Sequence, residues 1–113
     1  MDSILKSIVW MGDSLDRVRA FPGPARQDVG FQLDRVQRGL DPRDWKPMSS
    51  VGPGVVEIRV HASGEYRVFY IARFKEAVYV LHAFLKRAQR TPAREIALGR
   101  KRYGNLLREQ ERR

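Results

Sequence analysis

Hydrophobic residues follow a helical spacing through most of the first forty positions. The run KSIVWM at 6–11 predicts a short strand that ends at Gly12. Two helices follow, and the segment FPGPA at 21–25 separates them because proline cannot continue a helix. The first helix is short, and the second carries an apolar stripe that we expect to face the core: Val29, Leu33, Val36 and Leu40.

The pattern changes after the second helix. Residues 41–54 are rich in proline, glycine, serine and aspartate and predict a connecting loop, which we expect Trp45 and Met48 to fix to the body of the domain. Three segments rich in β-branched and aromatic residues then follow at short intervals. They predict consecutive antiparallel strands joined by tight turns, at 55–62, 65–74 and 76–86.

Alternation within these strands divides their side chains between two faces. In the strand at 55–62 we expect a buried apolar set and an exposed polar set: Val56, Ile58 and Val60 against Glu57, Arg59 and His61. In the next strand we expect Tyr66 and Tyr70 to be core aromatics. Thr91-Pro92 then opens a last helix, because threonine suits the N-cap and proline the first turn. This helix carries one apolar face, formed by Ile96, Tyr103 and Leu107.

The predicted fold class follows from the order of these elements. A strand, two helices, a three-stranded antiparallel meander and a basic C-terminal helix make an α+β fold. With 113 residues, of which 42% are hydrophobic, the chain can bury one modest core. We therefore expect a single domain at 1–113.

Positive charge is the first indication of function. The net charge is +9, and residues 86–113 hold ten basic and three acidic residues. Such a segment is attracted to a polyphosphate or an acidic protein, although it can equally be a solvated surface. The absence of cysteine and of a long apolar run predicts a soluble, cytoplasmic protein without a membrane partner.

The remaining polar residues suit metal-independent cleavage of RNA. The sequence has no GxxxxGK[ST] phosphate loop, no HExxH metal motif and no GxSxG elbow, and we expect no cofactor. In RNA the 2′-hydroxyl can attack the adjacent phosphate, so the protein has to move protons and stabilise charge. Four cations lie on or just beyond the predicted strands, where rigid backbone can aim them: Arg59, Arg67, Lys86 and Arg87. Their alternative interpretation is ordinary exposed strand residues.

The two histidines have different expected positions. His82 lies within an apolar run, in phase with Val78, Val80, Phe84 and Lys86. It is either a hydrogen-bonded core residue or, if it reaches a cleft, the best proton shuttle in the chain. His61 lies beside the Ser63-Gly64 turn and should be a surface residue.

The sequence from Trp45 to Arg102 resembles the RelE/ParE superfamily of toxins, and its HigB-like, phage-derived branch in particular. The resemblance is carried by KPM at 46–48, GVVEIR at 54–59, YRVFY at 66–70, the YVLHAF and KR segments at 79–87, and TP with EI at 91–96. It covers about half of the chain. It implies a RelE-like microbial RNase fold and the toxin of a type II toxin–antitoxin system, an mRNA interferase that cuts mRNA in the ribosome.

The resemblance also implies site residues and partners. Arg67 aligns with a family arginine, and Lys86 falls near a second family cation. Arg59 occupies a strand position where the family places lysine or arginine. The match of Arg87 depends on a shift of one position in register. The tyrosine that RelE carries after the last strand has no clear counterpart, which leaves the general base open, with His82 as a candidate. The family implies a helix-turn-helix antitoxin that contacts operator DNA. We expect basic residues of the last helix region to grip RNA: Arg90, Arg94, Arg100, Lys101 and Arg102.

Two other functions remain open on the same sequence. The chain can be a non-enzymatic inhibitor like the ParE branch, which poisons DNA gyrase, since fold does not determine activity. It can also be a plain nucleic-acid-binding module that uses its basic C-terminal helix.

Overall fold

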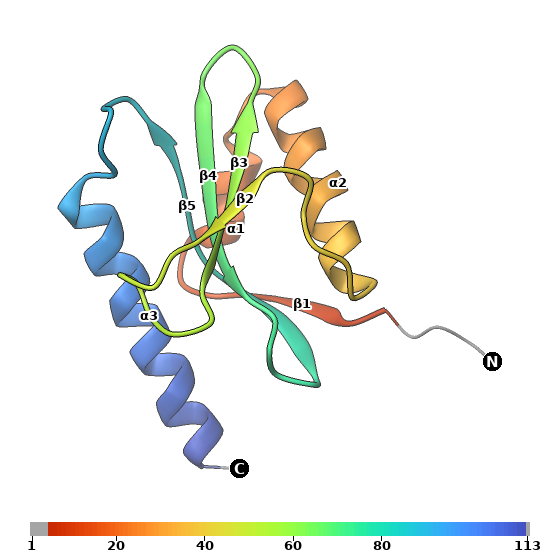
Figure 1. Cartoon of the computed structure of the whole chain (residues 1–113), viewed down its shortest axis with the longest axis vertical. Coiled ribbons are helices and arrows are strands. Elements are labelled where there is room, and N and C mark those ends of the chain that lie inside the picture. The colour runs from red at the N-terminus through yellow and green to blue at the C-terminus, as the bar shows by residue number, and fades with distance from the viewer. Residues whose placement is uncertain (1–4, 113) are drawn as a thin grey trace.

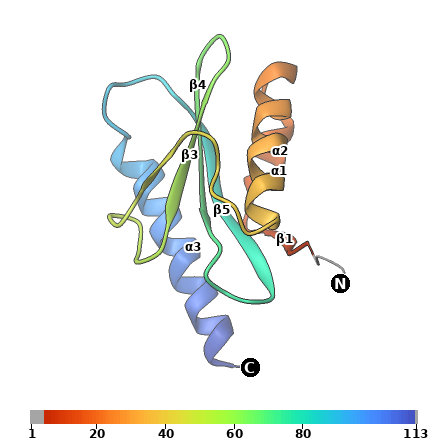
Figure 2. The ribbon, with the colours of Figure 1, turned by 45° about the vertical axis from the view of Figure 1, so that its right-hand side comes forward.

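The computed structural model describes residues 5–112 and has an α+β fold built on one mixed sheet. Residues 1–4 and 113 of the predicted domain lie outside the described residues. The elements, in chain order, are β1 (Ser7–Trp10), α1 (Ser14–Arg19), α2 (Gly23–Gln37), β2 (Trp45–Pro47), β3 (Val56–His61), β4 (Glu65–Ile71), β5 (Ala77–Lys86) and α3 (Ala93–Glu111). The sheet lies between α3 on one side and α1 with α2 on the other (Figures 1 and 2).

The five strands follow the spatial order β1-β5-β4-β3-β2. The predicted antiparallel meander of β3, β4 and β5 is confirmed. β1 pairs with β5 in parallel, and it covers only residues 77–80 of that longer strand. β2 pairs with β3 in antiparallel, so the prediction of an unbroken loop at 41–54 was wrong there. Its three residues include a proline, which an edge strand tolerates because one side of the strand has no partner.

Each face of the sheet packs into its own hydrophobic cluster. α1 and α2 cover one face, where Tyr66 and Tyr70 are buried as predicted. α3 covers the other face, where Met48 is buried as predicted and Tyr103 packs with Ile96 and Leu107. Two expectations were wrong, those for Trp45 and Leu40. Trp45 is 38% exposed on the edge strand, and Leu40 is 50% exposed because α2 ends at Gln37.

A β-bulge at Leu81 changes the alternation within β5. Phe69 is paired with His82, and the next residue of β4, Tyr70, is paired with Val80, so Leu81 has no partner of its own. Val80 therefore packs on the side of α1 and α2, whereas Phe84 packs under α3. The expected common phase of Val78, Val80, His82 and Phe84 was wrong, because an inserted residue reverses every position that follows it.

α3 crosses the sheet as a 19-residue amphipathic helix. It approaches the strands most closely at Gly99, where a Cβ atom would lie 3.0 Å from both Phe69 Cδ2 and Val51 Cγ1. Glycine at this position therefore permits the close packing of helix and sheet. Within residues 5–112, neither α3 nor any other helix has the length and apolar character that a membrane crossing needs.

Candidate functional site

Three of the predicted cations lie on one face of the sheet. Arg59 and Arg67 are direct cross-strand partners in β3 and β4, and Lys86 of β5 is the partner of Glu65. Partners in an antiparallel pair project to the same side, and alternate residues of a strand share that side. Because Phe69 and Phe84 on these strands pack under α3, the three cations project on the α3 side as well.

β2 adds a further cation to this face. Lys46 is the cross-strand partner of Glu57 and is exposed. Lys46 was not among the predicted site residues, because residues 41–54 were predicted to form a loop. The KPM segment, which resembles the toxin family, was the signal that pointed to it.

Arg67 is not the exposed strand residue that the sequence suggested. Its side chain is only 7% exposed. Nη1 donates hydrogen bonds of 3.1 Å to Glu65 Oε1 and to the carbonyl oxygen of Tyr66. These two acceptors hold the buried guanidinium in one orientation.

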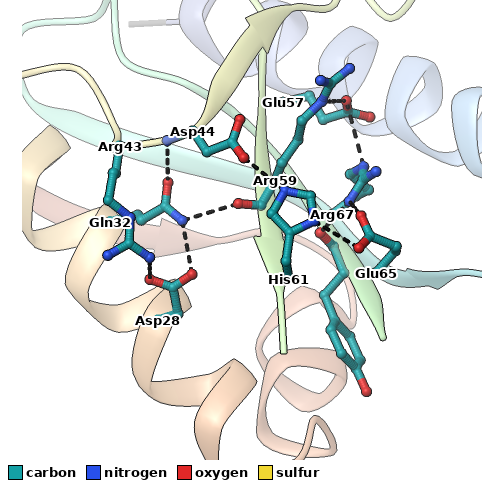
Figure 3. A network of polar contacts seen from close by, with 10 residues as sticks. Asp28, Gln32, Arg43, Asp44, Glu57, Arg59, His61, Glu65 and Arg67 are labelled. Atoms are coloured by element: carbon teal, nitrogen blue, oxygen red, sulfur yellow. Dashed lines mark hydrogen bonds and ion pairs between the residues drawn. The ribbon is translucent and has the colours of Figure 1, made fainter. Parts of the chain in front are cut away.

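Glu57 lies beneath the cations, and its predicted exposure was wrong. Its side chain is 2% exposed, with Oε1 3.4 Å from Arg59 Nε and 3.8 Å from Arg67 Nε (Figure 3). Among the described residues, Glu57 Oε2 and Arg67 Nε are buried without a hydrogen-bond partner. Simple alternation placed Glu57 outside because it took the α3 side to be solvent, whereas α3 and the 48–55 segment pack on that side. The buried carboxylate restrains both arginines.

A second polar group lies at the tip of the β3–β4 hairpin. His61 is exposed, as predicted, with Nδ1 2.7 Å from Glu65 Oε2 and Nε2 2.8 Å from Asp44 Oδ2 (Figure 3). The hydrogen bonds to Glu65 and then to Asp44 raise the pKa of His61 above its usual value. The carboxylate of Glu65 thus connects His61 to Arg67.

His82 is a hydrogen-bonded core residue, which was one of its two predicted interpretations. Its side chain is completely buried. Arg102 Nη1 lies 3.1 Å from Nδ1, and Nε2 lies 2.7 Å from Glu95 Oε1. A guanidinium can only donate, so Nδ1 accepts and Nε2 carries the hydrogen that Glu95 receives. Burial lowers the pKa of His82 in spite of the opposing effect of Glu95. A neutral ring with both nitrogens occupied has no free position for a substrate proton.

The basic residues of the last helix region are not equivalent. Arg90, Arg94 and Lys101 are exposed, and Arg100 is exposed while its Nε donates to the Ser50 carbonyl oxygen. Arg102 is different, because its side chain is 13% exposed and its Nη2 lies 2.7 Å from Asp13 Oδ1. Arg102 thus ties α3 to the turn before α1 and has little surface to offer RNA.

A pocket opens between the end of β5 and the start of α3, where β1 no longer covers the edge of the sheet. Phe84, Leu85 and Pro92 contribute to its walls, and its charged lining comes from three arginines and one carboxylate: Arg17, Arg87, Arg94 and Glu95. We call it the β5–α3 pocket. Arg87 and Arg94 were among the residues predicted from the sequence, whereas Arg17 and Glu95 were not. The TP and EI motif was the signal for Glu95.

The loop between β5 and α3 holds the cations nearest to this pocket. Lys86 Nζ donates a hydrogen bond of 2.7 Å to the Gln89 carbonyl oxygen. Arg87 makes no hydrogen bond or ion pair with any residue between 5 and 112, so its guanidinium is available for an anion. The same part of the chain contains no group of three or more His, Asp or Glu residues arranged to hold a metal ion.

The chain matches the sequence profile of a family described as phage derived protein Gp49-like (DUF891), over residues 16–104. The match extends from α1 into α3 and includes all four of the cations predicted to contact a phosphate. No curated protein matches the chain.

Proposed function

The chain belongs to the phage-derived Gp49-like (DUF891) family, which is related to HigB-like RelE/ParE toxins, and on this basis we propose that it is a toxin that cuts mRNA on the ribosome. In this proposal it is an endoribonuclease of a type II toxin–antitoxin system on a RelE-like fold and acts in the cytoplasm. The observation that supports it most directly is the grouping of Arg59, Arg67 and Lys86 on one face, beside a pocket with three further arginines.

The chemistry requires stabilisation of a phosphate that gains negative charge. When the 2′-hydroxyl oxygen attacks, the phosphorus passes through a pentacoordinate state, and fixed cations lower the energy of that state. Arginine provides a planar pair of donors that matches two phosphate oxygens. Arg59 is 35% exposed and can contact such oxygens directly.

The buried part of the cluster has a supporting role in this proposal. Arg67 has a positioning role in this proposal, because Glu65 and Glu57 hold its guanidinium in place and offset its charge. Glu57 also restrains Arg59, which limits the number of conformations that the guanidinium loses on binding RNA. Lys86 reaches the phosphate from the end of β5, with its hydrogen bond to Gln89 exchanged for one to the substrate.

Partners follow from the same proposal. A toxin of this class needs an antitoxin, for which we propose a helix-turn-helix protein that contacts operator DNA. The basic residues Arg90, Arg94, Arg100 and Lys101 would bind RNA on the ribosome. Such contacts predict an affinity that falls steeply as salt is raised.

Induction in cells that lack the antitoxin tests the function. We expect growth to stop and ribosome-bound transcripts to carry new 5′ ends within reading frames. Arg59→Ala and Lys86→Ala should each restore growth and remove these ends. Arg38→Ala is the matched control, because Arg38 is an exposed arginine at the end of α2, on the opposite side of the sheet.

The outcomes separate this function from its two rivals. Growth arrest with intact transcripts and a DNA-damage response would instead identify a gyrase inhibitor. Salt-dependent RNA binding without any growth defect would identify a plain binding module. Either result contradicts the proposed nuclease.

A further inference from the structure

Glu95 is a buried carboxylate whose two oxygens have different surroundings. Oε1 accepts the hydrogen bond from His82 Nε2 at 2.7 Å. Oε2 accepts no hydrogen bond from residues 5–112. It also remains accessible to solvent, because it is absent from the buried unpartnered atoms of that part of the chain. Glu95 lines the β5–α3 pocket, and because Oε1 is bonded to His82, Oε2 is the oxygen left to contact a ligand there. The nearest cationic atom to Oε2 is Arg94 Nε at 3.7 Å.

The orientation of Glu95 is fixed by a chain of donors behind it. Asp13 holds Arg102, Arg102 donates to Nδ1 of His82, and His82 donates to Glu95. Each member has one defined hydrogen-bonding role, because the guanidinium cannot accept and the neutral imidazole has a single hydrogen. The carboxylate therefore has a fixed position and a free lone pair, as a proton acceptor in a reaction requires.

The walls of the pocket compensate for the negative charge of Glu95. Arg17, Arg87 and Arg94 come from three separate segments and face the same space. Arg17 is paired with Asp13, whereas Arg87 has no partner among residues 5–112. A pocket with three guanidiniums can hold a phosphodiester although it contains a carboxylate, and a carboxylate beside a bound phosphodiester lies within reach of the ribose.

We propose that Glu95 is the catalytic base of RNA cleavage and that the scissile phosphodiester binds where the face of Arg59, Arg67 and Lys86 meets the β5–α3 pocket, at Phe84, which is the cross-strand partner of Arg67 and lines the pocket. This proposal rests on the nuclease function proposed above. Glu95 Oε2 takes the proton of the 2′-hydroxyl, and the 2′-oxygen forms a bond to phosphorus. The bond from phosphorus to the 5′-oxygen breaks, and that oxygen takes a proton from water. The resulting hydroxide takes the proton from Glu95. The products are a 2′,3′-cyclic phosphate and a 5′-hydroxyl, without oxidation or reduction.

A structural role is the alternative for Glu95, because the bond to His82 joins α3 to β5. Glu95→Gln separates the two roles. The glutamine carbonyl can still accept from His82 Nε2, but the amide cannot take a proton at neutral pH. We expect single-turnover cleavage of ribosome-bound mRNA to slow by about 100-fold or more. Affinity for a non-cleavable mRNA with a 2′-deoxyribose at the cut site should remain within about threefold, because the arginines are intact.

The dependence of the rate on pH provides a second measurement. The charged or titratable groups around Glu95 are His82 of β5, Arg94 of α3, Arg17 of α1, Arg87 of the loop and Arg102 behind His82. In the wild type we expect the rate to fall as acid protonates the base. This fall should persist in His82→Gln and disappear in Glu95→Gln. Glu109→Gln, an exposed carboxylate on the same helix, should behave like the wild type.

Several results would overturn the proposal. If the wild type cuts mRNA and Glu95→Gln cuts it at a similar rate with an unchanged pH profile, Glu95 is not the base although the nuclease function stands. If the wild type cuts no ribosome-bound mRNA, the nuclease function itself fails. If Glu95→Gln does not fold, Glu95→Asp replaces it. That variant should be slower than the wild type yet keep the acidic fall, and a flat profile would contradict the proposal.

Discussion

Arg102 of α3 donates a hydrogen bond of 3.1 Å from its Nη1 to Nδ1 of His82 in β5. The same guanidinium donates to the Leu81 carbonyl oxygen at 3.0 Å and to Asp13 Oδ1 at 2.7 Å. One arginine thus connects the turn before α1, the bulge of β5 and the last helix. It also determines which nitrogen of His82 carries the hydrogen, and therefore how Glu95 is held.

The pKa values of the two histidines should be shifted in opposite directions from the ordinary value. His61 takes up its proton more readily than usual because Glu65 and Asp44 accept from it, whereas burial lowers the pKa of His82. The chain has two histidines, so their ring resonances in an NMR titration can be assigned with one variant, His61→Gln. We expect one midpoint above and one below the ordinary pKa of 6.5. Two midpoints on the same side of this value would contradict the structure.

The stability of the protein should follow these shifts with opposite signs. Below pH 6.5 the unfolded chain protonates His82 while the folded chain resists protonation, so the contribution of His82 is retained above pH 6.5 and is lost as pH falls through its folded pKa. The contribution of His61 is present below pH 6.5 and is lost as pH rises through its folded pKa. His61 is half-exposed, so solvent makes its effect the smaller one. Urea unfolding of the wild type and His61→Gln across this range measures both effects.

Arg67 and Lys86 should differ in their importance for folding. Arg67→Ala removes a buried cation and leaves Glu57 with fewer partners, and we expect it to lower the free energy of unfolding by about 3 kcal/mol. Lys86→Ala removes a cation whose hydrogen bond is exposed and should change it by about 0.5 kcal/mol or less. Chemical denaturation of both variants decides between this result and equal effects. A loss of toxicity in Arg67→Ala therefore has to be corrected for folded protein, whereas Lys86→Ala reports on function directly.

Two glycines in helix interiors provide a matched test of packing. A Cβ atom added at Gly30 of α2 would meet no neighbouring atom within 4 Å, so Gly30→Ala should stabilise the protein by about 0.5–1 kcal/mol through helix propensity. A Cβ atom at Gly99 of α3 would lie 3.0 Å from Phe69 and Val51. Gly99→Ala should therefore destabilise the protein by about 1–3 kcal/mol, because two packed side chains have to move. Equal shifts in thermal unfolding would show that α3 does not pack this closely.

Asp13 offers a direct probe of the Arg102 network. Hydrogen bonds from Arg17 and then Arg102 outweigh partial desolvation and lower the pKa of Asp13 to about 2. Arg102→Gln should raise this pKa toward the ordinary 3.8, because one of the two guanidiniums is lost. The carboxyl carbon resonance of Asp13 in an acid titration measures the change. Arg112→Gln, an exposed residue at the C-cap of α3, is the control and should leave the midpoint unchanged.

Local sequence patterns predicted which helices and strands form better than they predicted which of these elements pair or pack together. The periodicity around Val29 and Val36 and the alternation at 56–60 identified α2 and β3 because each pattern arises within one element. The parallel pairing of β1 with β5 could not be found in this way, because it joins residues about seventy positions apart. β2 was missed because it is short and contains Pro47, so its composition resembles that of a loop.

The candidate site shows the same division. Residue type and the family resemblance identified Arg59, Arg67 and Lys86, because strand alternation places them on one side. The burial of Arg67 could not be predicted, since it depends on α3 and the 48–55 segment, which lie elsewhere in the sequence. Glu57, the partner of Arg59 and Arg67, and Glu95, the partner of His82, were missed for that reason. A carboxylate in a strand or helix pattern resembles a surface residue until the opposing element is known.

The bulge at Leu81 has a consequence for how the length of β5 can vary. Val80 and His82 occupy consecutive register positions against Tyr70 and Phe69, so a chain without residue 81 would still direct Lys86 to the side of Arg67. It would lose a buried leucine and the carbonyl that receives Arg102, but the cations would keep their arrangement. Removing one residue elsewhere in the 82–86 half would instead send Lys86 to the opposite surface. A deletion of Leu81 should therefore leave Arg67 and Lys86 on the same side of the sheet.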